Sequence, residues 1–274
     1  MKADLHCHSV YSDGSENVEN IIMQARALGI DYLALTDHDT LAGIEPAKRE
    51  ANRCGINLIP AVECSCLDKE RGRSVHVLCY NPKDPMTLQR FLNVTLQSRY
   101  NQKLKIIEKV REKYPVELDE VLALKGLSQS IYECHIMQVL AKKGYTNTVC
   151  GIMMRELLSS KGSCYVKTDY ADVRETVRVI RDCGGVVVLA HPQEYDSFDL
   201  FRELTNKGLI DGVEVFHPRN SIGFRQQLLE IAIDKDLIIT GGSDFHGSFS
   251  FNPHPLGYCT TDMHSLNRIL NYKR

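Results

Sequence analysis

The sequence lacks three features that would each point to a particular class of protein: a long apolar run, a strong net charge and a glycine-rich phosphate loop. No apolar run approaches the roughly 20 residues that a membrane-spanning helix needs. No apolar segment follows the basic second residue, so we expect no secretory leader. The formal net charge of -2 implies no polyelectrolyte partner. We therefore expect a cytoplasmic protein that neither enters a membrane nor forms a stable complex with nucleic acid.

The bulk composition is ordinary for a globular protein. Hydrophobic residues make up 43% of the 274 residues and charged residues 25%, which fits one large α/β domain or a domain with an insertion. The ten cysteines do not have the spacing of a small disulfide scaffold. We expect reduced and mostly buried thiols. This includes Cys64 and Cys66, because no second cysteine pair follows at zinc-finger spacing.

Apolar periodicity divides the chain into strands and helices with one long interruption. Seven short strands are predicted, at residues 4–8, 31–36, 57–64, 74–80, 186–190, 211–216 and 237–240. Helices are predicted at residues 17–28, 43–53, 172–183, 198–207, 222–235 and 263–270. Between 85 and 161 the pattern is helical without strands. We therefore expect residues 1–84 and 162–274 to form one domain, and residues 85–161 to form a helical insertion that caps the substrate site.

The predicted strands end in a common way. Six of the seven deliver His, Asp or Glu at the C-terminal end, and His76 lies within the fourth. Strands that alternate with helices form parallel sheets, and in parallel barrels the chemistry collects at the C-terminal strand ends. An open doubly wound sheet would gather its ligands at one crevice instead. The even spread of candidate ligands therefore predicts an α/β barrel that is closed or nearly closed.

The first predicted strand runs directly into His6-Cys7-His8, and Asp13 follows closely. Successive side chains of a strand point to opposite faces, so His6 and His8 share one face, about 6–7 Å apart. The turn that contains Asp13 can return its carboxylate to the same strand end. This combination favours a metal site over two histidines that are merely hydrogen-bonded within a buried strand.

Further candidate ligands occur at or near the ends of the other strands. The full set comprises six imidazoles and three carboxylates: His6, His8, Asp13, His38, Glu63, His76, His191, Asp244 and His246. One tetrahedral ion cannot use so many ligands, so the set predicts two or three divalent ions. Imidazole and carboxylate without thiolate suit Mn, Fe or Zn, and suit Ca or Mg poorly. Taken singly, His76 could be a core histidine and Asp244 a turn cap.

These motifs, in this order, resemble those of the polymerase-and-histidinol-phosphatase (PHP) family. The resemblance rests on His6-Cys7-His8, Asp13-Gly14, Thr36-Asp37-His38-Asp39, Glu63, His76, Ala190-His191-Pro192 and Gly242-Ser243-Asp244-Phe245-His246. It implies a distorted seven-stranded TIM-like barrel, a trinuclear metal site and phosphoester hydrolysis. It also implies three ligand sets: His6, His8, Glu63 and Asp244; Asp13, His38 and His246; and Glu63, His76 and His191. Glu63 would bridge two of the ions.

The helical insertion resembles that of the PHP branch with 3′,5′-nucleoside bisphosphate phosphatases and 5′-to-3′ exoribonucleases. Arg99 and His135 match recurring positions of that insertion, which implies that both contact substrate. Two arginines of the branch are missing. The segment Tyr132-Glu133-Cys134-His135 stands where the branch has Gly-Arg-x-His, and Gln193-Glu194 follows the His-Pro pair where Arg is common. These departures count against a nucleoside bisphosphate as substrate but leave the metal chemistry intact.

Residues after the sixth and seventh strands complete the predicted site. His217 could protonate the leaving group or bind phosphate, or it could be a solvent-side loop histidine. Arg219 could clamp a phosphate, or it could be an exposed charge before a helix. Asp244 and His246 are predicted to be catalytic as well as metal-binding. Asp37 and Asp39 are expected to orient ligands rather than bind metal.

The sequence thus predicts a metal-dependent phosphoric ester hydrolase that acts on a small phosphorylated metabolite by means of metal-activated hydroxide. The leading substrate class is a nucleotide, either a 3′,5′-bisphosphate or an AMP-like molecule, with short RNA ends as a related substrate. One alternative is histidinol phosphate, a sugar phosphate or a cyclic phosphodiester. A second alternative is a non-catalytic metal-binding accessory module, which the complete ligand set disfavours.

Overall fold

The computed structural model describes residues 1–273, and its seven strands form one sheet whose order in space follows the chain. The strands are β1 (Ala3–Cys7), β2 (Tyr32–Leu35), β3 (Asn57–Asp68), β4 (Arg73–Tyr80), β5 (Val186–Leu189), β6 (Gly212–Phe216) and β7 (Ile238–Gly241). The sheet closes beyond β1 and β7, where the amide of His8 donates to the Phe245 carbonyl at 2.8 Å. The amide of Asp244 donates to the His6 carbonyl at 2.9 Å. The predicted barrel is therefore confirmed.

The all-parallel arrangement that the alternation predicts is wrong at one strand. β4 is antiparallel to both β3 and β5, because only residues 69–72 separate β3 from β4 and a parallel crossover needs a dozen residues or more. The reversal places the first half of β4 beside the C-terminal ends of its neighbours. His76 lies opposite Ser65 of β3, and its carbonyl accepts from the amide of Ala190, just after β5, at 3.1 Å. A mid-strand histidine therefore reaches the same barrel end as the other candidate ligands.

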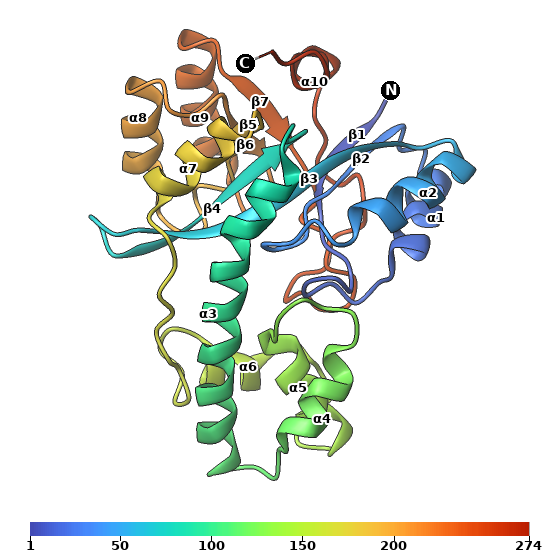
Figure 1. Cartoon of the computed structure of the whole chain (residues 1–274), viewed down its shortest axis with the longest axis vertical. Helices are drawn as coiled ribbons and strands as arrows, with labels where there is room; N and C mark the ends of the chain where they lie inside the picture. The colour runs from blue at the N-terminus through green and yellow to red at the C-terminus, as the bar shows by residue number, and fades with distance from the viewer. Residues whose placement is uncertain (274) are drawn as a thin grey trace.

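Six helices cover the outside of the barrel. They are α1 (Val18–Ala27), α2 (Ile44–Cys54), α7 (Val173–Asp182), α8 (Phe198–Asn206), α9 (Ile222–Asp234) and α10 (Met263–Leu270). Figure 1 shows α1 and α2 on one side of the barrel and α7, α8 and α9 on the other. Each group buries an apolar face against the strands that it covers. A third apolar cluster, with Leu5, Leu78 and Val188 among its members, draws on β1 to β5 and β7 and includes α10 residues.

The segment between β4 and α7 is helical, as the sequence predicts. It contains α3 (Pro85–Arg111), α4 (Leu118–Lys125), α5 (Glu133–Lys142) and α6 (Ile152–Leu158). Leu88 and Leu92 at the start of α3 pack in a barrel cluster, whereas Ile106 and Val110 near its end pack with α4, α5 and α6 in a separate apolar cluster. Figure 1 shows α3 leading away from the barrel to the lobe of α4 to α6, and both chain termini at the far end of the molecule.

Two further expectations concern membranes and thiols. No helix within residues 1–273 has the length and apolar character to cross a membrane. All ten cysteines are free thiols, and Cys64 and Cys66 are buried residues of β3. Neither belongs to a group of side chains with metal-binding geometry among the described residues.

Candidate metal centre

The predicted ligands meet at one end of the barrel, although they come from six strands and their loops. Among the described residues, three groups made up of predicted ligands have ligand atoms that all lie within 4.8 Å of one another: His8, Asp13, His38 and His246; His6, His8, Glu63 and Asp244; and His38, Glu63 and His76. A fourth group consists of His6, Glu214 and His217. The first two groups contain every residue that the family resemblance assigns to two of the ions. His191 is outside the third group, but its Nε2 lies 2.7 Å from Glu63 Oε1.

Glu63 lies at the centre of this arrangement and is 1% exposed. Its Oε1 is 2.7 Å from His191 and 2.8 Å from His76. Its Oε2 is 3.2–3.3 Å from three further imidazoles, those of His6, His8 and His38. One carboxylate that faces imidazoles with both oxygens has the geometry needed to bridge two cations.

Backbone conformation aims several of these side chains. His191 and Asp244, at the ends of β5 and β7, have φ values of 23° and 50°. Positive φ is costly for residues other than glycine and is concentrated at functional sites. Gly242 allows the close approach, because a Cβ there would lie 2.3 Å from the Cβ of His6. A glycine at this position therefore lets the segment after β7 lie directly against β1.

Unsatisfied polar atoms indicate that this cluster fits divalent cations. Several buried side-chain atoms make no contact of hydrogen-bond geometry within the described chain, although the Nδ1 atoms of His38 and His76 lie close to Glu63. They include His8 Nδ1, Asp13 Oδ1, His38 Nδ1 and His76 Nδ1. Burying a polar atom without a partner costs free energy, so native proteins rarely do so. In addition, His6 Nε2 and His8 Nε2 face each other at 3.2 Å. Converging nitrogen and oxygen atoms that lack partners are the donor set that Mn, Fe or Zn prefers.

The electrostatics of the cluster keep its carboxylates charged. Burial would raise the pKa of Asp13 and Asp244, but the surrounding imidazoles outweigh burial and hold both pKa values well below the ordinary range. Burial lowers the pKa of His38 well below its usual value, despite nearby carboxylates. For His8 burial acts in the same direction, but the carboxylates of Asp244 and Glu63 prevail and raise its pKa to about 10. A cation would replace that proton on His8.

Glu214, in the middle of β6, is a site residue that the sequence reasoning missed. It is fully buried, and its Oε1 accepts from His6 Nδ1 at 2.8 Å. Its Oε2 accepts from the amide of His191 at 2.9 Å. A carboxylate that holds the far nitrogen of a ligating imidazole fixes the tautomer and the ring orientation. The sequence did contain a signal for Glu214. It is a charged residue inside the predicted apolar strand 211–216, and a charge that is buried in a strand needs a partner.

Asp37 and Asp39 contact two segments that carry candidate ligands, the loop after β1 and strand β3. Asp37 accepts from the amide and hydroxyl of Ser9 at 2.8 and 2.7 Å and from the hydroxyl of Ser12 at 2.6 Å. It therefore fixes the loop between His8 and Asp13. Asp39 accepts from the amide of Ser65 at 2.8 Å. Neither aspartate belongs to a group with metal-binding geometry among residues 1–273.

A family model described as the PHP domain matches residues 4–178. The chain belongs to the PHP family. A phosphoribosyl 1,2-cyclic phosphate 1,2-diphosphodiesterase of Eggerthella lenta is 37% identical over 256 residues, 93% of this chain and 97% of that protein. A 5′-3′ exoribonuclease of Haemophilus influenzae is 30% identical, over 89% of this chain and 90% of that protein. A solved structure, a candidate metal-dependent phosphoesterase from Bifidobacterium adolescentis, superposes with a TM-score of 0.89 at 32% identity, over 98% of this chain and 95% of that one.

PHP membership confirms the predicted class, a metal-dependent phosphoester hydrolase with an α/β barrel. Of the residues predicted to contact the substrate of this PHP protein, only Arg219 lines the cleft over the metal centre. Arg219 lies at the rim of the cleft over the metal centre, which has a volume of about 190 Å³. It pairs there with Glu194, another lining residue. His217 is fully buried, which removes the solvent-side alternative. Its Nδ1 accepts from the amide of Arg219 at 3.2 Å, and its Nε2 faces Asp244 Oδ2 at 3.3 Å.

The two insertion residues that the resemblance implied as substrate contacts do not line this cleft. Arg99 is 8% exposed, and its Nη2 donates to Asp39 Oδ2 at 2.8 Å and to Ser65 at 2.7 Å. His135 is 4% exposed, and its Nδ1 accepts a hydrogen bond from the amide of Tyr132 at 3.0 Å. This hydrogen bond caps the N-terminus of α5. The sequence could not foresee this inward orientation, because helical periodicity does not say what a polar side chain on a packed face will meet.

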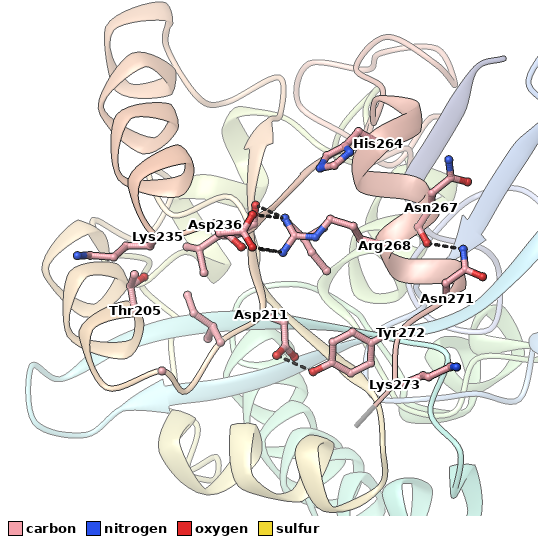
Figure 2. A pocket seen from close by; sticks show the side chains of 14 residues that line it. Thr205, Asp211, Lys235, Asp236, His264, Asn267, Arg268, Asn271, Tyr272 and Lys273 are labelled. Carbon is pink, nitrogen blue, oxygen red and sulfur yellow. Dashed lines mark hydrogen bonds and ion pairs between the residues drawn. The ribbon is translucent and has the colours of Figure 1, made fainter.

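A larger cavity, of about 750 Å³, lies at the opposite end of the PHP barrel, where β6 and β7 begin. Figure 2 shows several of its lining side chains paired with one another. The Tyr272 hydroxyl donates to Asp211 at 2.6 Å, and Arg268 pairs with Asp236 at 3.2 Å. In barrels of this type that end serves stability rather than chemistry. The smaller cleft over the metal centre is therefore the candidate active site.

Proposed function

We propose that this PHP protein hydrolyses a phosphoester of a phosphorylated pentose, with the 1,2-cyclic phosphodiester of a phosphoribosyl group as the first candidate. The observation that carries the proposal is the similarity to the Eggerthella lenta enzyme, which extends over nearly the whole of both chains. The sequence supports it as well, since two arginines common in the nucleoside bisphosphate branch are missing here. The proposal thus takes up the cyclic phosphodiester alternative in preference to a nucleotide.

The metal ligands remain a proposal and follow the groups in the structure. His6, His8, Glu63 and Asp244 would hold one divalent ion, and Asp13, His38 and His246 a second. Glu63, His76 and His191 would hold a third, by virtue of the contacts of both imidazoles with Glu63. Divalent ions bound there would polarise phosphoryl oxygens. They would also lower the pKa of bound water, so that hydroxide is available for attack near neutral pH.

The side chains around this centre would orient the reacting groups. Glu214 holds His6 through Nδ1, so that Nε2 faces the centre. His217 accepts a backbone hydrogen bond at Nδ1, which places its proton on Nε2, beside Asp244. When water adds to phosphorus, one ester P–O bond breaks, and the departing sugar oxygen needs a proton. We assign this donation to His217, with the proton of the attacking water restoring the imidazole.

The helical insertion would act as a cap over this reaction. Cys150 and Met154, from the turn before α6 and from α6 itself, line the cleft together with His76, His191 and Asp244 of the barrel. A lid of this kind limits access of bulk water and supplies contacts beyond the reacting phosphate. We therefore propose that residues 85–161 form the substrate cap, with Arg99 as a residue that positions the cap rather than one that contacts substrate.

The experiment is a comparison of ester substrates with the metal-reconstituted full chain, followed by phosphorus NMR. Phosphoribosyl 1,2-cyclic phosphate should be opened to a phosphomonoester with a kcat/KM well above that for a nucleoside 3′,5′-bisphosphate or a 5′-phosphorylated RNA oligomer. A generic aryl phosphate should also turn over, because it needs only the metal centre. No turnover of any ester with Mn, Fe or Zn would contradict the hydrolase and favour an accessory role.

A nucleotide or short RNA end is the second candidate substrate. The similarity to the Haemophilus influenzae exoribonuclease favours it, and Phe249, Phe251 and Tyr195 line the cleft and could stack on a base. Higher kcat/KM on the bisphosphate or RNA substrates in the same comparison would select this candidate. For either candidate we propose a cytoplasmic location, because ten free thiols suit a reducing compartment.

A further inference from the structure

A cavity of about 320 Å³ adjoins the cleft over the metal centre, and we call it the second cavity; it is distinct from the larger one at the opposite end of the barrel. The second cavity and the cleft share Arg219, Asp244, Ser250 and Phe251 as lining residues. The barrel supplies His217 and Arg219 to the second cavity, the segment after β7 supplies Asn252 and His254, and α6 supplies Arg155. A molecule that reacts at the metal centre can therefore extend into this second cavity.

The cationic side chains of the second cavity are those of Arg155 and Arg219. Two guanidinium groups and two imidazoles line it, and Asp244 is its single acidic lining residue. Asp244 is directed toward the metal centre: its Oδ1 lies 3.4 Å from His6 and 3.3 Å from His8. Its Oδ2 lies 3.3 Å from His217. Asp244 forms no ion pair with either guanidinium group.

The two arginines differ in how they are held. The guanidinium of Arg155 lies over the Phe251 ring, 4.5 Å from its centroid, and has no ion pair with any carboxylate of residues 1–273. Arg219 is paired with Glu194 through Nη1, which anchors it while its other N–H groups stay available. A guanidinium has five donors in a planar fork that matches phosphate oxygens. Together the two side chains offer a phosphate group donors from two directions.

We propose that this cavity is a subsite for a second phosphate of the substrate, one that does not react. The inference rests on the proposed function and deepens it, because a phosphoribosyl cyclic ester carries a phosphate on the far side of its sugar. Arg155 and Arg219 are specificity-determining residues in this proposal. They occupy positions other than those of the two arginines that this chain lacks, one after its His-Pro pair and one at the first residue of α5.

The first test compares two substrates in kcat/KM: ribose 1,2-cyclic phosphate with and without a 5-phosphate. In the wild-type chain the 5-phosphate should raise kcat/KM. Arg155→Ala should lower kcat/KM for the phosphorylated substrate about 10- to 100-fold, because a charge-assisted hydrogen bond is lost, and should leave the other substrate nearly unchanged. Arg178→Ala, an exposed arginine of α7, is the matched control. Equal losses on both substrates, or none on either, would overturn the subsite.

The second test measures binding and does not depend on which ester is hydrolysed. Ribose 1,5-bisphosphate and ribose 1-phosphate are titrated by calorimetry into metal-reconstituted protein. The bisphosphate should bind at least 10-fold more tightly to wild type, and Arg155→Ala should abolish that difference. If the wild-type chain does not open the cyclic ester, the proposed function fails, and the calorimetry still decides the subsite. Equal affinity of wild type for the two ligands rules the subsite out.

Discussion

His6 and Glu214 form a buried hydrogen bond, with 2.8 Å between Nδ1 and Oε1, although 208 residues separate them in the chain. The bond directs His6 Nε2 at the candidate metal centre, where a bound cation would take the place of any proton on that nitrogen. Burial would raise the pKa of Glu214, but His6 and the neighbouring imidazoles hold it below its ordinary value. The carboxylate thus stays charged and can act as the fixed partner of a ligating imidazole.

The first prediction is that Glu214→Gln weakens metal binding. The amide keeps an acceptor oxygen for His6 but loses the negative charge, so metal affinity should fall about 10- to 100-fold, as is typical for partners of this kind. Metal titration with a competing chelator measures the change. Glu230→Gln, at an exposed position of α9, serves as the matched control. An unaltered affinity for Glu214→Gln would show that Glu214 has only a structural role.

The second prediction concerns metal content. Purified protein reconstituted with Mn should carry more than one first-row metal ion per chain, because nine nitrogen and oxygen ligands converge. Since metal that binds only the native state adds to the free energy of unfolding, chelation should also lower Tm. Elemental analysis and a thermal scan with and without chelator measure both. One equivalent or less would contradict a multinuclear centre.

The third prediction is that Glu63→Gln loses metal and activity together. Both carboxylate oxygens face imidazoles at 2.7–3.3 Å, and an amide can offer only one oxygen to a cation. Elemental analysis and turnover of an aryl phosphate should decline in parallel, while circular dichroism confirms folding. Near-normal turnover with full metal content would remove Glu63 from the bridging position.

The fourth prediction separates two roles for Arg99. Its buried pair with Asp39 joins α3 to the loop after β2, and removing one partner of such a pair costs about 3–5 kcal/mol. If Arg99 positions the cap, Arg99→Ala should reduce stability and lower kcat/KM alike for a phosphoribosyl ester and an aryl phosphate. Arg111→Ala, whose pair with Glu117 is exposed, should do neither. A loss confined to the larger substrate would instead assign Arg99 to substrate contact.

The fifth prediction concerns pH and His135. Burial lowers the pKa of this histidine to about 4, whereas an unfolded histidine titrates near 6.5. Between these values the unfolded chain binds a proton that the native chain does not, so His135 makes stability fall as pH drops from about 6.5 to 4. Urea unfolding at pH 7 and pH 5 should show a smaller loss for His135→Gln than for wild type. An identical loss would contradict a neutral, buried His135.

Local patterns were sufficient to predict the strands, most helices and the set of side chains that converge at one end of the barrel. His6 and His8 share a strand face whatever the rest of the chain does, because the side-chain period of a strand is two. Parallel strands also bring their C-terminal ends to one end of a barrel, so His38, Glu63 and His191 could be grouped before any contact was known. These are properties of backbone geometry, and the sequence carries them directly.

Only the tertiary structure decided which polar side chains meet. Periodicity placed Arg99 on a helix, but the packing of α3 determined that its guanidinium meets Asp39 instead of the cleft. The direction of β4 depended on a connection that is too short for a parallel crossover. The sequence shows Glu214 as one charged residue in an apolar strand, and only the fold shows that its partner is His6 of β1. Partners far apart in the chain are selected by the closing of the barrel and by the cost of burying an unpaired charge. Local sequence patterns do not encode that selection.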